Sequence, residues 1–186
     1  MPLKELHRQM QERMKKAVEA LEKELKTLRT GRASTGLVES VTVRAYESDT
    51  PLKALATLST PDARTIQIQP WDRNLLGAIE KAILAANLGL TPNNDGRLIR
   101  INIPVLTEER RKELVRVAHK MAEDSRVAVR NVRRHANEEI RALEKKHDIS
   151  EDDRDAATAE VQKYTDETIA EIDKHLAAKE KEIMEV

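Results

Sequence analysis

The sequence predicts an α+β protein in which a small β/α/β domain is inserted into an elongated three-helix bundle. Apolar residues recur every three or four positions in three long segments, which is typical of amphipathic helices. All five glycines and five of the six prolines fall between residues 31 and 106, where alternating strand patterns replace the helical ones. We therefore expect a bundle made of residues 1–30 and 107–186, and a small domain made of residues 31–106.

The first helix is predicted over residues 3–29, where a leucine, methionine or valine returns with helical spacing from Leu3 to Leu28. Gly31 is expected to end it, because glycine readily adopts the left-handed conformation found after helices. Two short linkers, Thr30-Gly31-Arg32 and Pro104-Val105-Leu106, would join the two domains. We expect these linkers to act as a two-stranded hinge.

Strands of the small domain are predicted at residues 41–45, 65–69 and 98–103, with a weaker one at 55–60. A helix is expected between them, with Asp72 as its N-cap and Gly89 as its C-terminal stop. The stretch 92–96 has the composition of a turn. Trp71 is expected to pack within this domain, and an exposed stacking platform is the alternative.

The second helix of the bundle is predicted from Thr107 to about His147, a run that contains neither glycine nor proline. Thr107 followed by two glutamates is a favourable helix start, and Lys145 and Lys146 suit the negative end of the helix dipole. Some 40 residues at 1.5 Å each would give a rod of roughly 60 Å. The third helix is predicted to begin at Ser150, with Asp153 completing a capping box.

Arginines follow one line of the second helix, about 100° or more from its apolar line. Residues 110–146 contain twelve Lys and Arg against six Asp and Glu. No acid stands four residues from Arg126, Arg130 or Arg133, where helical ion pairing would place one. Since a guanidinium can grip two phosphate oxygens at once, this favours a nucleic-acid backbone as partner. A solvated helix face is the plainer alternative. The predicted contact residues here are Arg126, Arg130, Arg133 and Arg134.

Composition narrows the classes of function. The absence of cysteine excludes disulfides and thiolate chemistry, and no segment has the continuous apolar length of a membrane span. We expect a cytoplasmic protein with no membrane partner. No catalytic motif is found, and His135 and Glu138 lack a third ligand for a metal. We therefore expect no enzyme activity, no cofactor and no metal.

Two other classes stay open at this point. A coiled-coil adaptor would self-associate through apolar stripes left uncovered, and one stripe per helix favours a monomer instead. An enzyme with its active site in the small domain is the second alternative, although no residue pattern indicates a class of substrate.

Four segments together resemble the bacterial ribosome recycling factor family, in the right order and spacing along the whole chain. They are Arg29-Thr30-Gly31-Arg32-Ala33, Leu88-Gly89-Leu90-x-Pro92, Pro104-x-Leu106-Thr107-Glu108-Glu109-Arg110-Arg111-Lys112, and residues 126–134, Arg-Val-Ala-Val-Arg-Asn-Val-Arg-Arg. One departure is Ala45-Tyr46-Glu47, where many members have a Tyr-Tyr-Gly run. This departure concerns the local turn.

The resemblance implies an L-shaped, tRNA-like molecule that binds the post-termination ribosome. It implies contact with large-subunit rRNA through Arg130 and Arg133, helped by Arg29, Arg32 and Arg111. It also implies that elongation factor G and GTP hydrolysis then separate the subunits and release mRNA and tRNA, with the small domain facing that partner. No catalytic residue is implied in this chain.

Overall fold

The computed structural model describes residues 2–185 and divides the chain into two compact units, which correspond to residues 1–30 with 107–186 and to residues 31–106. The first unit contains the helices α1 (Pro2–Lys26), α3 (Glu108–Lys145) and α4 (Glu151–Met184). The second contains six strands and the helix α2 (Leu76–Ala85). The expected fold class, a helical bundle with an inserted small α+β unit, is confirmed.

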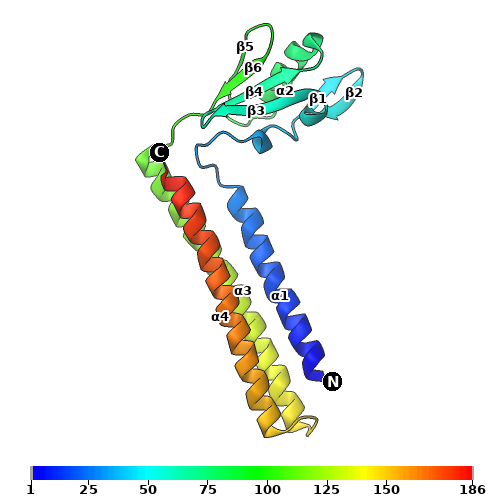
Figure 1. The fold of residues 1–186 in the computed structure, drawn as a ribbon, viewed down its shortest axis with the longest axis vertical. Helices are drawn as coiled ribbons and strands as arrows, with labels where there is room; N and C mark the ends of the chain where they lie inside the picture. The colour runs from blue at the N-terminus through cyan, green and yellow to red at the C-terminus, as the bar shows by residue number, and fades with distance from the viewer. Residues whose placement is uncertain (1, 186) are drawn as a thin grey trace. The chain divides into compact units, whose positions relative to one another are not determined.

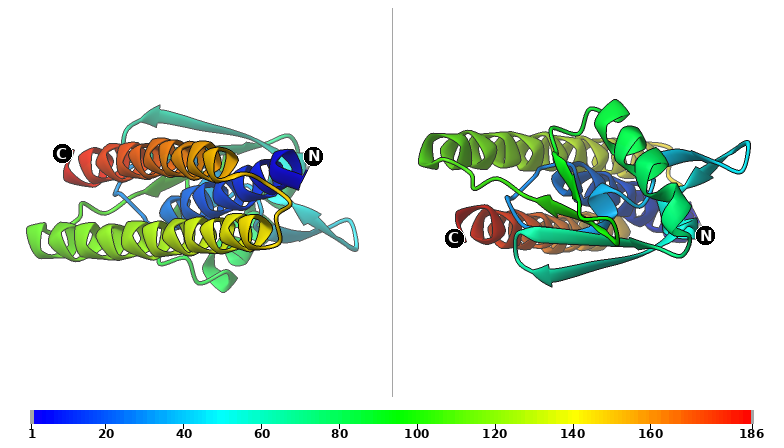
Figure 2. Two further views of the ribbon diagram at one scale, coloured as in Figure 1. Left: turned by 90° about the horizontal axis from the view of Figure 1, so that it is seen from below. Right: turned by 90° about the horizontal axis from the view of Figure 1, so that it is seen from above.

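The three long helices lie side by side, and α3 runs antiparallel to α1 and α4 (Figures 1 and 2). The parallel register of α1 and α4 is constant along their length. His7 faces Glu160, and His175 faces Glu22, so the same offset of 153 residues separates the partners at both ends. The buried side chains of each helix form one stripe toward the other two, with Met14, Val129, Ile140, Val161 and Ile172 fully covered. Packing therefore follows the periodicity in the sequence.

The helix termini show why the rods begin and end where they do. Thr107 accepts a hydrogen bond from the amide of Arg110, and Ser150 and Asp153 form a complete capping box. After α3 the chain reverses through His147, which has a φ of 61°. The amides of His147 and Asp148 donate to the carbonyls of Glu144 and Leu143, which is the Schellman arrangement. A histidine thus occupies a left-handed position that usually takes glycine.

Two helix ends differ from the sequence expectation. Helix α1 ends at Lys26, five residues before Gly31, although Gly31 does have a positive φ of 75°. Helix α2 ends at Ala85, and Asn87, with a φ of 52°, takes the left-handed position before Gly89 is reached. Asparagine tolerates this conformation better than most residues.

The second unit is built on a four-stranded antiparallel sheet in the order β3-β4-β6-β5, formed by Ala56–Asp62, Thr65–Pro70, Ile99–Asn102 and Pro92–Asn94. A separate hairpin pairs β1 (Thr42–Ala45) with β2 (Ser48–Pro51). Its two-residue turn places Tyr46 and Glu47 at positive φ, which is the geometry that suits such hairpins. The core is formed by buried side chains from the strands and α2, among them Val43, Ile66, Ile68, Ile79, Ile83, Ile99 and Ile101. The strands β2 and β5 were not expected from the sequence.

Trp71 does not pack inside the second unit. Its side chain is 69% exposed, and its indole Nε1 donates to Thr57 Oγ1 at 3.1 Å. Nearby in the chain, Asp72 accepts a hydrogen bond from the amide of Asn74 and another from the hydroxyl of Tyr46 at 2.5 Å. The expected packing role of Trp71 is therefore wrong. Its exposure is compatible with the alternative role.

Candidate nucleic-acid interface

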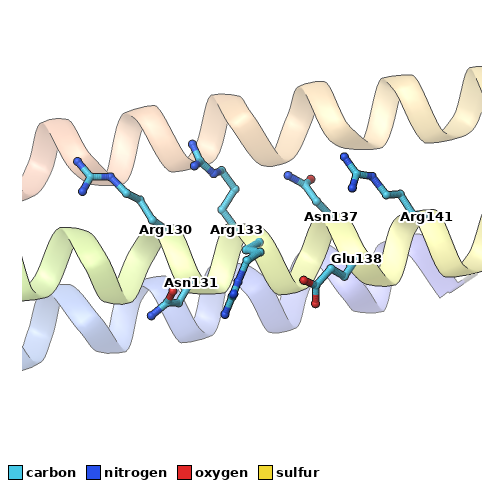
Figure 3. Close-up of a pocket in the computed structure, with 7 residues that line it drawn as sticks. Arg130, Asn131, Arg133, Asn137, Glu138 and Arg141 are labelled. Atoms are coloured by element: carbon cyan, nitrogen blue, oxygen red, sulfur yellow. The ribbon is translucent and has the colours of Figure 1, made fainter.

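An open hollow of about 490 Å³ lies on the surface of α3, at the predicted arginine row. Four arginines line it, together with two asparagines and one glutamate: Arg130, Arg133, Arg134, Arg141, Asn131, Asn137 and Glu138. Figure 3 shows Arg130, Arg133 and Arg141 leaving α3 on the side of α4, whereas Asn131 and Glu138 leave it on the other side. Helical spacing of three and four residues produces this row.

The arginines of the hollow are only loosely held by the protein. Arg133 Nη1 donates to the Gln162 amide oxygen at 3.4 Å, which is a long and neutral contact. Arg130 Nη1 reaches Glu123 Oε1 at 3.1 Å, and the Arg130 side chain remains 46% exposed. Solvent-exposed pairs of this kind contribute little to stability, so a stronger anion could replace the carboxylate. The hollow therefore has the chemistry to bind phosphate groups.

Arg126 differs from the other members of the row. Its Nε and Nη2 both donate to Asp173 Oδ1 on α4, at 3.0 and 2.6 Å, and its Nη1 donates to Glu123 Oε2 at 3.1 Å. Only 18% of its side chain is exposed. The hydrogen bonds that Arg126 donates to Asp173 are the main reason why the pKa of Arg126 is raised above its usual value. Arg126 thus connects α3 to α4.

The expectation that the arginines lack acidic partners is therefore wrong for Arg126 and Arg130. Glu123 serves both, and its pKa is lowered first by the hydrogen bond from Arg126 and then by that from Arg130. Glu123 stands three residues before Arg126, a spacing that also permits helical ion pairs and was visible in the sequence. Asp173 could not be found in this way, because its contact depends on the register between two helices.

The remaining predicted contact residues lie outside the hollow. Arg29 and Arg32 are exposed and flank Thr30 and Gly31 in the first linker. Thr30 is buried, and its hydroxyl donates to Glu182 Oε1 of α4 at 3.1 Å. Arg111 is half-buried on the first turn of α3, and its Nε is covered without a hydrogen-bond partner. Arg29, Arg32 and Arg111 are therefore not among the residues that line the hollow.

Comparison with known proteins identifies the family. A family model described as ribosome recycling factor matches residues 21–184. This chain belongs to the ribosome recycling factor family. A ribosome-recycling factor from Oleidesulfovibrio alaskensis is 58% identical over 176 residues, which cover 95% of this chain and 96% of the relative. That of Bacillus subtilis is 54% identical over 183 residues, covering 98% and 99%.

Solved structures of the family share the fold. A solution structure of a ribosome recycling factor matches with a TM-score of 0.78 and 49% identity, covering 100% of this chain and 99% of that one. A second match is the T. thermophilus ribosome recycling factor, described together with E. coli elongation factor G bound to the E. coli post-termination complex. Its TM-score is 0.64, with 48% identity and full coverage of both chains.

None of the helices within residues 2–185 combines the length and the apolar character that crossing a lipid bilayer requires.

Proposed function

We propose that this chain recycles ribosomes: it binds the post-termination ribosome and, with elongation factor G and GTP hydrolysis, promotes its dissociation into subunits with release of mRNA and tRNA. Membership of the family supports the general function. The observation that carries the mechanism is the hollow on α3, where four arginines surround a single acid. The chain is proposed to act in the cytoplasm as a monomer without catalytic residues.

The bundle would bind large-subunit rRNA through the phosphate backbone. Arg130, Arg133 and Arg134 are the proposed contact residues of the hollow, with Arg29, Arg32 and Arg111 as additional basic contacts. Phosphate contacts fix position and orientation without reading base sequence, which suits a protein that recognises folded RNA. Because Arg126 is already held by two carboxylates, its proposed role is to position α3 against α4.

The second unit is the proposed surface for elongation factor G. The known complex of a related factor with that protein on the ribosome supports the partner. The linkers at residues 30–32 and 104–106 are the proposed hinge, since Gly31 has a positive φ and Val105 is 53% exposed. In this mechanism GTP hydrolysis belongs to the partner.

A self-associating adaptor is less well supported. Within the bundle, and among residues 2–185, the exposed large apolar side chains are Val117, Val127 and Met184. Val117 and Val127 are ten residues apart, which places them roughly 80° apart around α3. They do not form the continuous stripe that a coiled-coil partner requires.

The decisive experiment measures binding to post-termination ribosomes by co-sedimentation at several salt concentrations. Arg133→Ala should weaken binding and reduce the slope of log K against log salt by about 0.7–0.9, as expected for one lost phosphate contact. Arg8→Ala is the matched control, because Arg8 is also exposed and helical but lies on α1 between Glu5 and Glu12. Equal binding by wild type and Arg133→Ala at every salt concentration would refute the proposed interface.

Subunit separation is then followed by light scattering with elongation factor G and GTP. The wild-type chain should dissociate post-termination ribosomes only when both are present. Binding without any dissociation would leave the interface intact and refute the recycling function.

A further inference from the structure

A histidine and two glutamates meet at a different place on the bundle, between α1 and α4. Glu171 and His175 are four residues apart on α4, so both point from one face of that helix. Glu22 approaches them from α1. Among residues 2–185, this is the group of three His, Cys, Asp or Glu residues whose ligand atoms come within 4.8 Å of one another. The group lies on different helices from the arginine row.

The distances fit a single small cation. His175 Nε2 lies 3.0 Å from Glu22 Oε1 and 3.9 Å from Glu171 Oε1. Zinc binds imidazole nitrogen and carboxylate oxygen at about 2.0–2.2 Å, so two of its tetrahedral ligand atoms lie roughly 3.3–3.5 Å apart. The two separations bracket this value. Small side-chain rotations would bring all three atoms to bonding distance.

The donor types also favour zinc over the common hard cations. Magnesium and calcium are bound almost entirely by oxygen, whereas imidazole suits zinc. Two carboxylates would neutralise the charge of Zn²⁺ while His175 binds as the neutral imidazole. The three side chains are partly open to solvent, with 33%, 40% and 58% exposure for His175, Glu22 and Glu171. Water could therefore complete the coordination.

We propose that Glu22, Glu171 and His175 form a zinc site that clamps α1 to α4. Glu22 stands four residues before the end of α1 at Lys26. A metal at this position would hold the last turn of α1 against α4. Binding to the folded chain would then stabilise the bundle by mass action.

Three of the four other histidines provide an internal comparison. His7, His119 and His135 each face one glutamate, namely Glu160, Glu180 and Glu138. A pair offers two ligands, whereas a stable zinc site takes at least three protein ligands. His119 is the best control, because its glutamate lies on a second helix, as at the proposed site, and its side chain is exposed, unlike that of His7.

The test is isothermal titration of the full chain with zinc chloride after chelator treatment, with magnesium chloride as a parallel arm. Wild type and His119→Gln should bind one zinc with the same Kd. His175→Gln and Glu171→Gln should bind zinc at least about tenfold more weakly. Even the loss of a residue that only hydrogen-bonds to a metal ligand lowers metal affinity by ~10–100-fold. Magnesium should give no comparable binding.

Thermal unfolding gives an independent measurement. Zinc at about tenfold above the Kd should raise the Tm of wild type and His119→Gln by roughly 3–6 °C. The Tm of His175→Gln should rise by at most about 1–2 °C, and its Tm without zinc shows whether the variant is folded. Equal zinc affinity in wild type and His175→Gln would overturn the proposal. So would the absence of zinc binding by folded wild type, which would leave the cluster as an ion pair only.

Discussion

We predict that removing the negative charge of Glu123 strengthens RNA binding, because this one carboxylate holds two arginines of the same helix. Its Oε1 accepts from Arg130 and its Oε2 from Arg126. If Arg130 binds phosphate, it must first give up or share its contact with Glu123. Replacing Glu123 by glutamine keeps the size of the side chain and removes the competing charge. We therefore expect Glu123→Gln to bind ribosomes more tightly than wild type.

The magnitude follows from the exposure of the pair. Both side chains are about half exposed, 46% for Arg130 and 52% for Glu123, so water screens their attraction. Ion pairs of this kind correspond to a factor of about 1.4–5 in an equilibrium constant. Ribosome affinity at moderate salt should rise within that range. Asp173 continues to hold Arg126, so the bundle should remain folded.

The assay is the same co-sedimentation over a series of salt concentrations, with circular dichroism melting to check the fold. Glu138→Gln is the control for the general loss of one negative charge, because Glu138 lines the same hollow but pairs with His135. Release of Arg130 predicts a larger gain for Glu123→Gln than for Glu138→Gln. An equal gain would assign the effect to net charge alone, and weaker binding by folded Glu123→Gln would refute the reasoning.

Three further predictions concern stability. Arg126→Ala should lower the free energy of unfolding by about 1–2 kcal/mol in a urea titration, because it removes the charged hydrogen bonds between α3 and α4. Tyr46→Phe should raise the pKa of Asp72, which the tyrosine hydroxyl lowers in the folded chain, and NMR titration measures this directly. The stabilisation from this pair is present above the ordinary carboxyl pKa and is lost as pH falls through the lowered one, so the stabilities of Tyr46→Phe and wild type should converge in acid. Gly31→Ala should cost about 1 kcal/mol or more, since it forces a side chain into a positive φ and places its Cβ 3.2 Å from a leucine side chain in the second linker.

The long helices could be predicted because their signals are local. Thr107 and Ser150 carry their capping contacts within three residues, and no glycine or proline interrupts the helices that follow. The arginine row was equally visible, since helical spacing alone places Arg130, Arg133 and Arg141 on one line. In these features, the residues that contact one another or share a face are also close together in the sequence.

Two of the features that were missed depend on partners far away in the chain, and the third, β5, depends on pairing with a strand that follows it closely. β5 consists of Pro92, Asn93 and Asn94, which are typical turn residues, and it becomes a strand only by pairing with β6. In the sequence, Arg126 cannot be distinguished from the other arginines of the row. Its ion pair with Asp173 depends on how α4 is aligned with α3. The trio of Glu22, Glu171 and His175 likewise needs the alignment of the first and last helices. The secondary-structure propensities of single residues do not indicate how helices that are distant in the sequence align with one another.

The parallel alignment of α1 with α4 also has a consequence for the order in which the bundle assembles. Contacts between these helices join residues 153 or 154 positions apart, as for His7 with Glu160 and Met14 with Thr168. The turn between α3 and α4 is only a few residues long, so these two helices can pair as a local hairpin, whereas α1 must close a far longer loop. Because α1 is synthesised before α3 and α4, the part of its apolar stripe that packs on α4 stays uncovered until α4 has been made.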